Sequence, residues 1–331
     1  MLEREPAGRW IRRFLLEHVI AERNLSRNTQ KSYRDTMTLL LPFVGRKADR
    51  AIDRLALEDF TPETIRGFLN SLEQDRGSSV ATRNQRLATV HAWARFVAEH
   101  LSEQVVWSSQ VRAIPFKKAP RSVVAYLEKA EMDALLDAPE RGSPQGCRDY
   151  ALLLTLYNSG ARASEIAQAT IGDLDLGRCP SIRIQGKGNK TRLCPLWRKT
   201  VDFLAPLVAG RDSAEPVFLN RSRRPFTRFG ILVMVKRYAN QAVRKAPSLA
   251  KKKVGAHTIR HTTAVHLLRA GVDINTIRAW LGHVSLNTTN IYAEVDLELK
   301  AQALAHCEPA GAKPPKRWRE EPGVLAFLRT L

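Results

Sequence analysis

Residues 257–292 read HTIRHTTAVHLLRAGVDINTIRAWLGHVSLNTTNIY and restrict the fold more than any other stretch of the chain. His257 and Arg260 are three residues apart, so in a helix they lie one turn apart and face the same way. The apolar residues that follow, at 264, 265, 267 and 268, predict that the next turns pack into a core. The sequence therefore predicts a helix that presents a histidine and an arginine at its first turn.

The second half of this stretch predicts a short helix between two glycines. Gly271 is expected to end the first helix, since glycine adopts the left-handed cap conformation at little cost. Asp273 is a typical N-cap for the next helix, and Gly282 is expected to end it and to present His283 on a tight turn. Tyr292 follows nine residues after His283. Polar, titratable groups are thus offered at helix starts and turns around a buried scaffold.

The charge of the chain points to a polyanionic partner. Its 331 residues, enough for one large or two ordinary domains, carry 53 Lys and Arg against 33 Asp and Glu, a formal net charge of +20. Residues 1–120 hold 20 basic and 14 acidic residues, or +6, and the remainder holds 33 and 19, or +14. Nucleic acid is the commonest partner of such a chain, although a basic protein that is merely soluble would have the same composition.

Cysteine spacing and hydropathy argue against several other classes. The four cysteines are far apart and form no Cys-x-x-Cys pair, which argues against a zinc site and a disulfide framework (Cys147, Cys179, Cys194, Cys307). No stretch of about 18 apolar residues is present, so no membrane span is expected. The N-terminus does not resemble a signal peptide. A cytoplasmic location is expected.

Residues 1–107 predict a small bundle of four helices. The first spans about 6–24, and the others begin after the capping residues Ser26, Thr61 and Ser79. Pro42 lies inside the second pattern, where it would kink the helix or end it before Gly45. Residues 108–124 break the periodicity with prolines and a lysine pair, and they are expected to form an extended basic linker.

Residues 125–305 predict a second, mixed domain. Within it, Gly160 is expected to close a buried helix, and Arg162 and Glu165 lie at the turn into the next. Segments 181–185 and 191–194 alternate like strands of a hairpin, with Lys187 at its glycine-rich tip. Basic clusters at 221–228 and 251–253 are expected to meet phosphates. In the C-terminal tail, residues 306–331, the apolar run 324–328 is expected to dock either on another protomer or on its own domain.

Taken together, these residues resemble the tyrosine recombinase (phage integrase) family. The resemblance covers roughly residues 10–305 and is carried by an ordered set of motifs: Gly160-x-Arg162-x-x-Glu165, Lys187 in a hairpin turn, His257-x-x-Arg260, Leu281-Gly282-His283, and Tyr292. One departure is Ala161, where the family usually has leucine, and it should affect packing and not chemistry. The resemblance implies a mainly α fold with an N-terminal SAM-like core-binding bundle. It also implies a mixed α/β catalytic domain of the DNA breaking-rejoining type with a small antiparallel sheet, and a C-shaped clamp around DNA.

The residue types suit cleavage of a phosphodiester. A protein nucleophile keeps the phosphate as an ester and preserves the energy of the bond, which a tyrosine such as Tyr292 can do. Two guanidinium groups, Arg162 and Arg260, can bind the oxygens of a phosphate that gains negative charge. The family resemblance implies that Lys187 protonates the departing 5′ oxygen. It further implies that His257 moves the tyrosine proton or holds the phosphate.

The resemblance assigns the remaining roles and the partners. His283 would donate a hydrogen bond to the phosphate, and Glu165 would support the ring of donors. The expected enzyme is a site-specific DNA recombinase that forms a 3′-phosphotyrosyl intermediate and needs no ATP, divalent metal or other cofactor. Its expected partner is double-stranded DNA with specific core sites in the form of inverted repeats, on which the protein would be a homo-tetramer.

Several alternatives remain open at this point. The biological role would be that of an integrase or transposase of a mobile element, or that of a Xer-like dimer resolvase. Less favoured are a type IB topoisomerase, which shares this chemistry, and a DNA-binding protein without catalysis. A zinc site at His257, His261 and His266 is disfavoured, because His266 would point elsewhere and no carboxylate lies between them.

Overall fold

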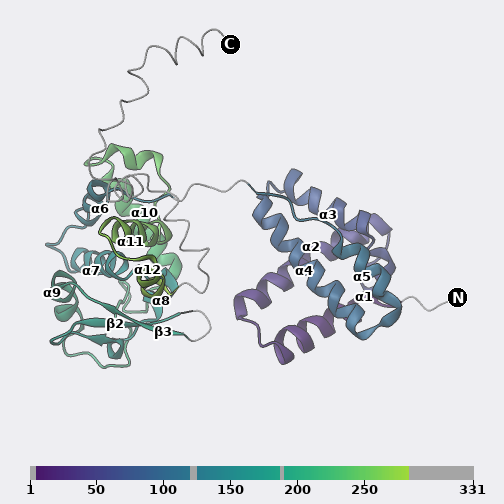
Figure 1. Ribbon diagram of the computed structural model, residues 1–331, viewed down its shortest axis with the longest axis horizontal. Helices are drawn as coiled ribbons and strands as arrows, with labels where there is room; N and C mark the ends of the chain where they lie inside the picture. Colours follow the sequence, from purple (N-terminus) through teal and green to yellow (C-terminus); the bar gives the residue numbers. More distant parts are fainter. Residues whose placement is uncertain (1–4, 120–124, 187–189, 283–331) are drawn as a thin grey trace, which may run out of the picture. The chain divides into compact units, whose positions relative to one another are not determined.

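The computed structural model describes residues 5–119, 125–186 and 190–282, and the chain divides into two compact units at Arg121 and Ser122. Figure 1 labels the α-helices of both units and strands β2 and β3. Each unit has its own hydrophobic core. Within the described ranges, no helix is long and apolar enough to cross a membrane.

The N-terminal unit consists of helices packed around aromatic and aliphatic side chains. Helix α1 (Ala7–Arg13) continues directly into a π-helical segment, η1 (Phe14–Glu22). The other long helices are α2 (Arg27–Ala48), α3 (Pro62–Gln74) and α4 (Val80–His100). Short 3-10 turns occupy Ile52–Arg54, Leu57–Asp59 and Ser102–Gln104. The N-caps predicted for the long helices are confirmed, as Ser26, Thr61 and Ser79 each accept a hydrogen bond from a backbone N–H three residues on.

Two predictions for this unit were wrong. Pro42 does not end its helix, because α2 runs on to Ala48 and stops only where Asp49 takes the left-handed conformation (φ 50°). Gly45 therefore lies inside the helix, where a Cβ would stand 3.0 Å from the carbonyl oxygen of Arg50. Proline removes one backbone donor, and the packing of a long amphipathic helix can outweigh that loss.

The predicted extended linker also begins too early. Val105–Arg112 forms a fifth helix, α5, which packs mainly on α4, and Val111 and Ile114 are buried in the core of the unit. The next residues are bonded to α4 as well, since Asn84 exchanges hydrogen bonds with the backbone of Lys117 at both its N–H (3.1 Å) and its carbonyl (2.7 Å). The N-terminal unit thus extends at least to Lys117.

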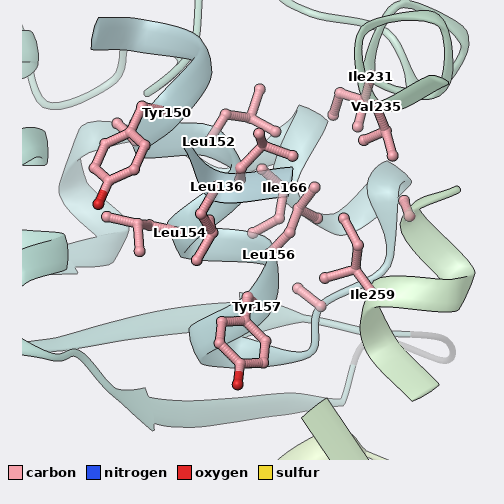
Figure 2. Close-up of a cluster of buried hydrophobic side chains, with 14 of the residues drawn as sticks. Leu136, Tyr150, Leu152, Leu154, Leu156, Tyr157, Ile166, Ile231, Val235 and Ile259 are labelled. Atoms are coloured by element: carbon pink, nitrogen blue, oxygen red, sulfur yellow. The ribbon is translucent and has the colours of Figure 1, made fainter. Parts of the chain in front are cut away.

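The C-terminal unit is built around the buried helix α7 (Pro144–Ser159). Around it lie α6 (Lys129–Leu136), α8 (Ala163–Gln168), α9 (Arg198–Val208), α10 (Arg228–Ala242), α11 (Ala256–Arg269) and α12 (Ile274–Leu281). The 3-10 turns are Ile171–Asp173 and Pro247–Lys251. Figure 2 shows Leu152 and Leu156 of α7 in one cluster with Ile231 of α10 and Ile259 of α11. Almost every side of α7 is covered between Asp149 and Ser159, which agrees with the mainly apolar sequence of this part of the helix.

A small antiparallel sheet completes this unit, as the resemblance implied. Its order is β1 (Leu174–Asp175), β2 (Ser181–Gln185) and β3 (Thr191–Pro195). Strands β2 and β3 form the predicted hairpin, with Ile182 opposite Cys194 and Gln185 opposite Thr191. Ile182, Ile184 and Cys194 face the core. The inner face of the hairpin therefore holds the two strands against the helices.

Candidate active site

The turn between α7 and α8 places Arg162 and Glu165 as the sequence predicts. Gly160 caps α7 in the left-handed conformation (φ 59°), and Arg162 takes the N-cap position of α8. Oε2 of Glu165 accepts a hydrogen bond from the backbone N–H of Arg162 (2.9 Å), and Oε1 accepts one from Nη1 of the same arginine (2.6 Å). The carboxylate thus fixes both the backbone and the guanidinium of Arg162.

Arg260 lies in the first turns of α11 and is almost completely buried, with 2% of its surface exposed. Its Nη1 donates to the carbonyl oxygen of Gly160 (2.7 Å), and its Nη2 donates to that of Leu281 (2.7 Å). One guanidinium therefore joins the C-terminus of α7 to the C-terminus of α12. Both carbonyls belong to the last turn of a helix, where the acceptors lack intrahelical partners and a positive charge is favourable.

Gly160 also allows a close approach that no other residue would permit. A Cβ on Gly160 would stand 2.5 Å from Cδ2 of Leu281 and 3.4 Å from Cγ2 of Thr263. Gly160, Leu281 and Thr263 come from three different helices, so the glycine is where α7, α11 and α12 meet. The sequence predicts Gly160 as a helix end, but not this packing role.

Helix α12 begins and ends as predicted. Asp273 accepts hydrogen bonds from the backbone N–H groups of Asn275 and Thr276, and Gly282 closes the helix at φ 67°. The side of Gly282 is occupied by Arg192, whose Nη1 lies 3.1 Å from the position of a Cβ there. The residue that follows, His283, lies outside the described residues.

Arg192 on β3 is the component that the sequence did not reveal. Its Nη2 donates to Oε2 of Glu165 (2.8 Å), and its Nε donates to the carbonyl oxygen of Trp280 (2.8 Å). Strand alternation gave a usable signal, since Arg192 shares a face with the buried Cys194, and an arginine on an inner face requires a carboxylate partner. That partner is distant in sequence, so the pairing could be seen only in the fold.

Glu165 is ionised in this setting. Burial alone would raise its pKa, but hydrogen bonds from Arg192 and from the backbone and side chain of Arg162 outweigh burial, and the pKa is lowered. A buried carboxylate between two guanidiniums leaves a net positive charge at this end of the unit. That charge is suited to an anionic ligand.

His257 lies in the first turn of α11, on its exposed side, one turn before Arg260. Partial removal of its ring from water lowers its pKa, and the charges of Arg260 and then Arg162 lower it further. Its ring packs edge-on against that of His261 at 5.1 Å between centroids, and burial together with His257 and Arg260 lowers the pKa of His261 to about 4. His257 is therefore mainly neutral at pH 7, as a proton acceptor must be.

The fold separates the third histidine from these two. His266 bonds through Nδ1 to the hydroxyl of Tyr157 (2.7 Å), and its ring lies against that of the tyrosine. Among the described residues, no group of three or more His, Cys, Asp or Glu side chains comes together in a way that could hold a metal ion.

The structure thus brings together Arg162, Glu165, His257 and Arg260, which the resemblance selects. Lys187, His283 and Tyr292 lie outside the described residues. Their neighbours in the chain are placed: Gly186 lies beside Glu165, with 3.6 Å from its Cβ position to Oε1, and Gly282 lies beside Arg192. Gly186 and Gly282, which precede Lys187 and His283 in the sequence, therefore both adjoin the Glu165–Arg192 pair.

This arrangement can hold a phosphate by charge and hydrogen bonds and can accept a proton at a neutral imidazole. Arg162 is about one-third exposed, so its guanidinium is accessible, while the carboxylate that orients it is buried. An arginine fixed by a buried carboxylate is a preorganised donor, because its orientation costs nothing further when an anion arrives.

Family models match both units of the chain. Residues 125–298 match the phage integrase family, and residues 11–100 match the N-terminal SAM-like domain of phage integrases. The y4rC protein of Sinorhizobium fredii, named as an integrase/recombinase, is 37% identical over 320 residues, which are 96% of each chain. Tyrosine recombinase XerC of Roseiflexus castenholzii is 30% identical and covers 90% of this chain and 93% of its own.

Solved structures show the same fold at lower identity. The XerH recombinase in its pre-cleavage complex with the difH substrate matches with a TM-score of 0.64 and 23% identity, over 86% of this chain and 81% of that one. The Tn1549 transposon integrase in complex with transposon right end DNA matches with a TM-score of 0.67 and 16% identity, over 91% and 99%. Both units are matched in order, and the chain therefore belongs to the phage integrase family of tyrosine recombinases, enzymes that cleave and rejoin DNA.

Proposed function

We propose that this protein is a site-specific recombinase that cuts and reseals DNA through a 3′-phosphotyrosyl intermediate, with Tyr292 as the nucleophile. The hydroxyl oxygen of Tyr292 attacks the scissile phosphorus, the bond from phosphorus to the 5′ oxygen breaks, and a proton passes to that oxygen. The 5′-hydroxyl of a partner strand then attacks the phosphotyrosine and restores a phosphodiester. The bond energy is kept, so no nucleotide hydrolysis is needed.

The observation that carries the proposal is the arrangement of Arg162 and Arg260 around the junction of α7, α8, α11 and α12. Arg260 bonds to the carbonyl of Gly160, two residues before Arg162, so the two guanidiniums belong to one structural unit. A charge pair at about 4 Å contributes about 4 kcal/mol at an effective dielectric of about 20. Two positive groups beside a phosphate can thus stabilise its transition state without a divalent ion.

Other residues supply proton transfers and orientation in this proposal. Lys187 protonates the leaving 5′ oxygen, and His283 donates a hydrogen bond to the phosphate. His257, whose pKa is lowered, accepts the tyrosine proton or contacts the phosphate. Glu165 orients Arg162 through its two hydrogen bonds to that residue.

The proposed partner is double-stranded DNA with specific core sites arranged as inverted repeats. The net charge of +20 supports a nucleic acid partner. A solved structure with this fold is a lambda integrase tetramer bound to a Holliday junction. On this basis we propose a homo-tetramer on DNA. The N-terminal unit, which extends at least to Lys117, would be the core-binding domain, 125–305 the catalytic domain, and 306–331 a tail that contacts another protomer.

The biological role we propose first is that of an integrase or transposase of a mobile element. The likeness to y4rC over 96% of both chains supports it, as does the fold of the Tn1549 transposon integrase. A Xer-like dimer resolvase is the second candidate, since XerC of Roseiflexus castenholzii is 30% identical over 90% of this chain.

Recombination between two sites tests this function and separates it from topoisomerase activity. The substrate is a supercoiled plasmid carrying two copies of the DNA from the ends of the gene's own locus, incubated in EDTA. A recombinase yields deletion or inversion products joined within the sites. Relaxation of a plasmid that lacks the sites, without recombinant products, would instead indicate a topoisomerase and contradict the proposal.

A further inference from the structure

Arg192 connects parts of the chain that carry four of the proposed catalytic residues. It lies on β3, and only 10% of its side chain is exposed. Its Nη2 donates to Oε2 of Glu165 and its Nε to the carbonyl oxygen of Trp280, each at 2.8 Å. Its Nη1 is also 3.5 Å from the Cβ position of Gly186, the residue before Lys187. Contacts with α8, the hairpin turn and the end of α12 therefore converge on one guanidinium.

The contact with Glu165 divides that carboxylate between two arginines. Oε1 accepts from the side chain of Arg162, and Oε2 accepts from the backbone N–H of Arg162 and from Arg192. With Oε2 held in this way, the carboxylate cannot rotate without breaking these bonds. Arg192 therefore fixes the plane of the group that orients Arg162.

The contact with Trp280 fixes the other side of the site. Arg192 holds the carbonyl of Trp280, and Arg260 holds the next carbonyl, that of Leu281. Two buried guanidiniums thus satisfy consecutive acceptors at the C-terminus of α12, immediately before Gly282. Gly282, which directly precedes His283 in the sequence, lies against Arg192, with 3.2 Å between its Cβ position and Cδ of the arginine.

We infer that Arg192 is a positioning residue for strand cleavage. It sets the placement of Arg162 through its bond to Glu165, and it sets the placement of the last turn of α12, which directly precedes His283 in the sequence, through its bond to Trp280. This inference rests on the proposed function. Arg192 is 10% exposed and its two bonds go to protein groups, so it acts on the phosphate only through the residues that it holds. A misplacement of about 1 Å in such a site costs about 100-fold in rate.

Lysine cannot replace Arg192 in this geometry. The planar guanidinium bonds to two acceptors in different directions, whereas an ammonium group is a single point of charge on a flexible stem. Arg192→Lys keeps the charge beside Glu165 and loses the simultaneous bond to Trp280. It is therefore the variant that separates charge from positioning, and it is less disruptive to folding than Arg192→Ala.

The matched control lies on the neighbouring strand. Arg183 on β2 pairs with Asp173 through Nε at 3.0 Å, but 57% of its side chain is exposed and it contacts none of the site residues named above. Arg183→Lys makes the same chemical change in the same sheet. Any effect of the change on the sheet itself appears in both variants.

The experiment measures single-turnover formation of the covalent protein–DNA adduct on a nicked target site, together with DNA affinity and melting temperature. We expect Arg192→Lys to cleave about 100-fold more slowly than wild type, with DNA affinity within about threefold, and Arg183→Lys to match wild type. The double variant Glu165→Gln/Arg192→Lys should lose less cleavage rate than the product of the two single fold-losses, because both substitutions act on the same contact. Wild-type cleavage by Arg192→Lys would overturn the inference. So would a loss of binding or melting temperature that accounts for the whole loss of activity.

A modified leaving group identifies the side of the phosphate on which Arg192 acts. With sulfur in place of the bridging 5′ oxygen, the leaving group is a thiolate, which departs without protonation because thiol pKa values are about 8.5. This substrate should restore cleavage by Lys187→Ala but not by Arg192→Lys, whose defect lies in the phosphate-binding groups. Restoration of Arg192→Lys would overturn this assignment. Absence of any adduct with wild type on both substrates would instead refute the proposed function.

Discussion

Substitution of Gly160 by alanine tests whether α7, α11 and α12 meet as the structure shows. At φ 59° a non-glycine residue costs about 1–2 kcal/mol, and this cost is partly offset by about 0.4–1 kcal/mol of lost entropy in the unfolded chain. The new Cβ would also lie 2.5 Å from Cδ2 of Leu281, about 1–1.5 Å closer than carbon atoms pack. Relief of that overlap adds about 1–3 kcal/mol, for a net loss of about 1–4 kcal/mol.

The control for Gly160→Ala is Gly210→Ala. Gly210 also has a positive φ, 71°, but nothing lies within 4 Å of its Cβ position, so its substitution carries the backbone cost alone. Urea unfolding of both full-length variants, followed by circular dichroism, gives the difference in free energy. We expect Gly160→Ala to be less stable than Gly210→Ala by about 1–3 kcal/mol, in the transition of the C-terminal unit. Equal stabilities, within about 0.4 kcal/mol, would refute the packing described for Gly160 and Leu281.

Further predictions concern charge and pH. Asp149 is completely buried and binds Arg148, Arg237 and Tyr238, so Asp149→Ala should lower the free energy of unfolding in urea by about 3–5 kcal/mol. Asp35→Ala, which removes an exposed ion pair, should lower it by under about 1 kcal/mol. Similar losses in the two variants would contradict the burial of Asp149. The pKa of His261 is lowered to about 4 against 6.5 for an unperturbed histidine, so between these pH values the unfolded state binds more protons than the folded state. The contribution of the neutral His261 to the free energy of unfolding should therefore be fully present above pH 6.5 and decline toward pH 4. His261→Asn should flatten this decline, by at most about 3 kcal/mol, and an unchanged profile of stability against pH would contradict the assignment. Glu165→Gln should slow cleavage by about 10-fold or more with little change in DNA affinity, as measured by adduct formation, and an unchanged rate would exclude its role in orienting Arg162.

The local signals in the sequence predicted the helix ends well. Ser26, Thr61 and Asp273 cap helices, and Gly160 and Gly282 end them, because each property depends on a few neighbouring residues. The hairpin followed in the same way from alternation on both sides of a glycine-rich turn. The motif spacing then identified Arg162, His257 and Arg260, which the fold brings together at the starts of α8 and α11.

The predictions failed where contacts between residues distant in the sequence determine the structure. The segment after residue 107 contains prolines and lysines and looks like a linker, yet Val111 and Ile114 are buried and Asn84 binds the backbone of Lys117. Arg192 was missed for a similar reason, since its partner Glu165 lies 27 residues away and only the fold joins them. The burial of Arg260 and its bonds to two helix ends were likewise beyond any local pattern.

In the proposed mechanism, Tyr292 becomes covalently joined to DNA. The most direct measurement is to incubate wild-type protein and Tyr292→Phe with a nicked target site in EDTA, to isolate adducts that resist SDS, and to locate the nucleotide by mass spectrometry of the peptides. We expect an adduct with wild type alone, on the peptide that contains Tyr292, with DNA binding retained by the variant. An adduct with Tyr292→Phe, or a nucleotide on another residue, would contradict the assignment of Tyr292 as the nucleophile.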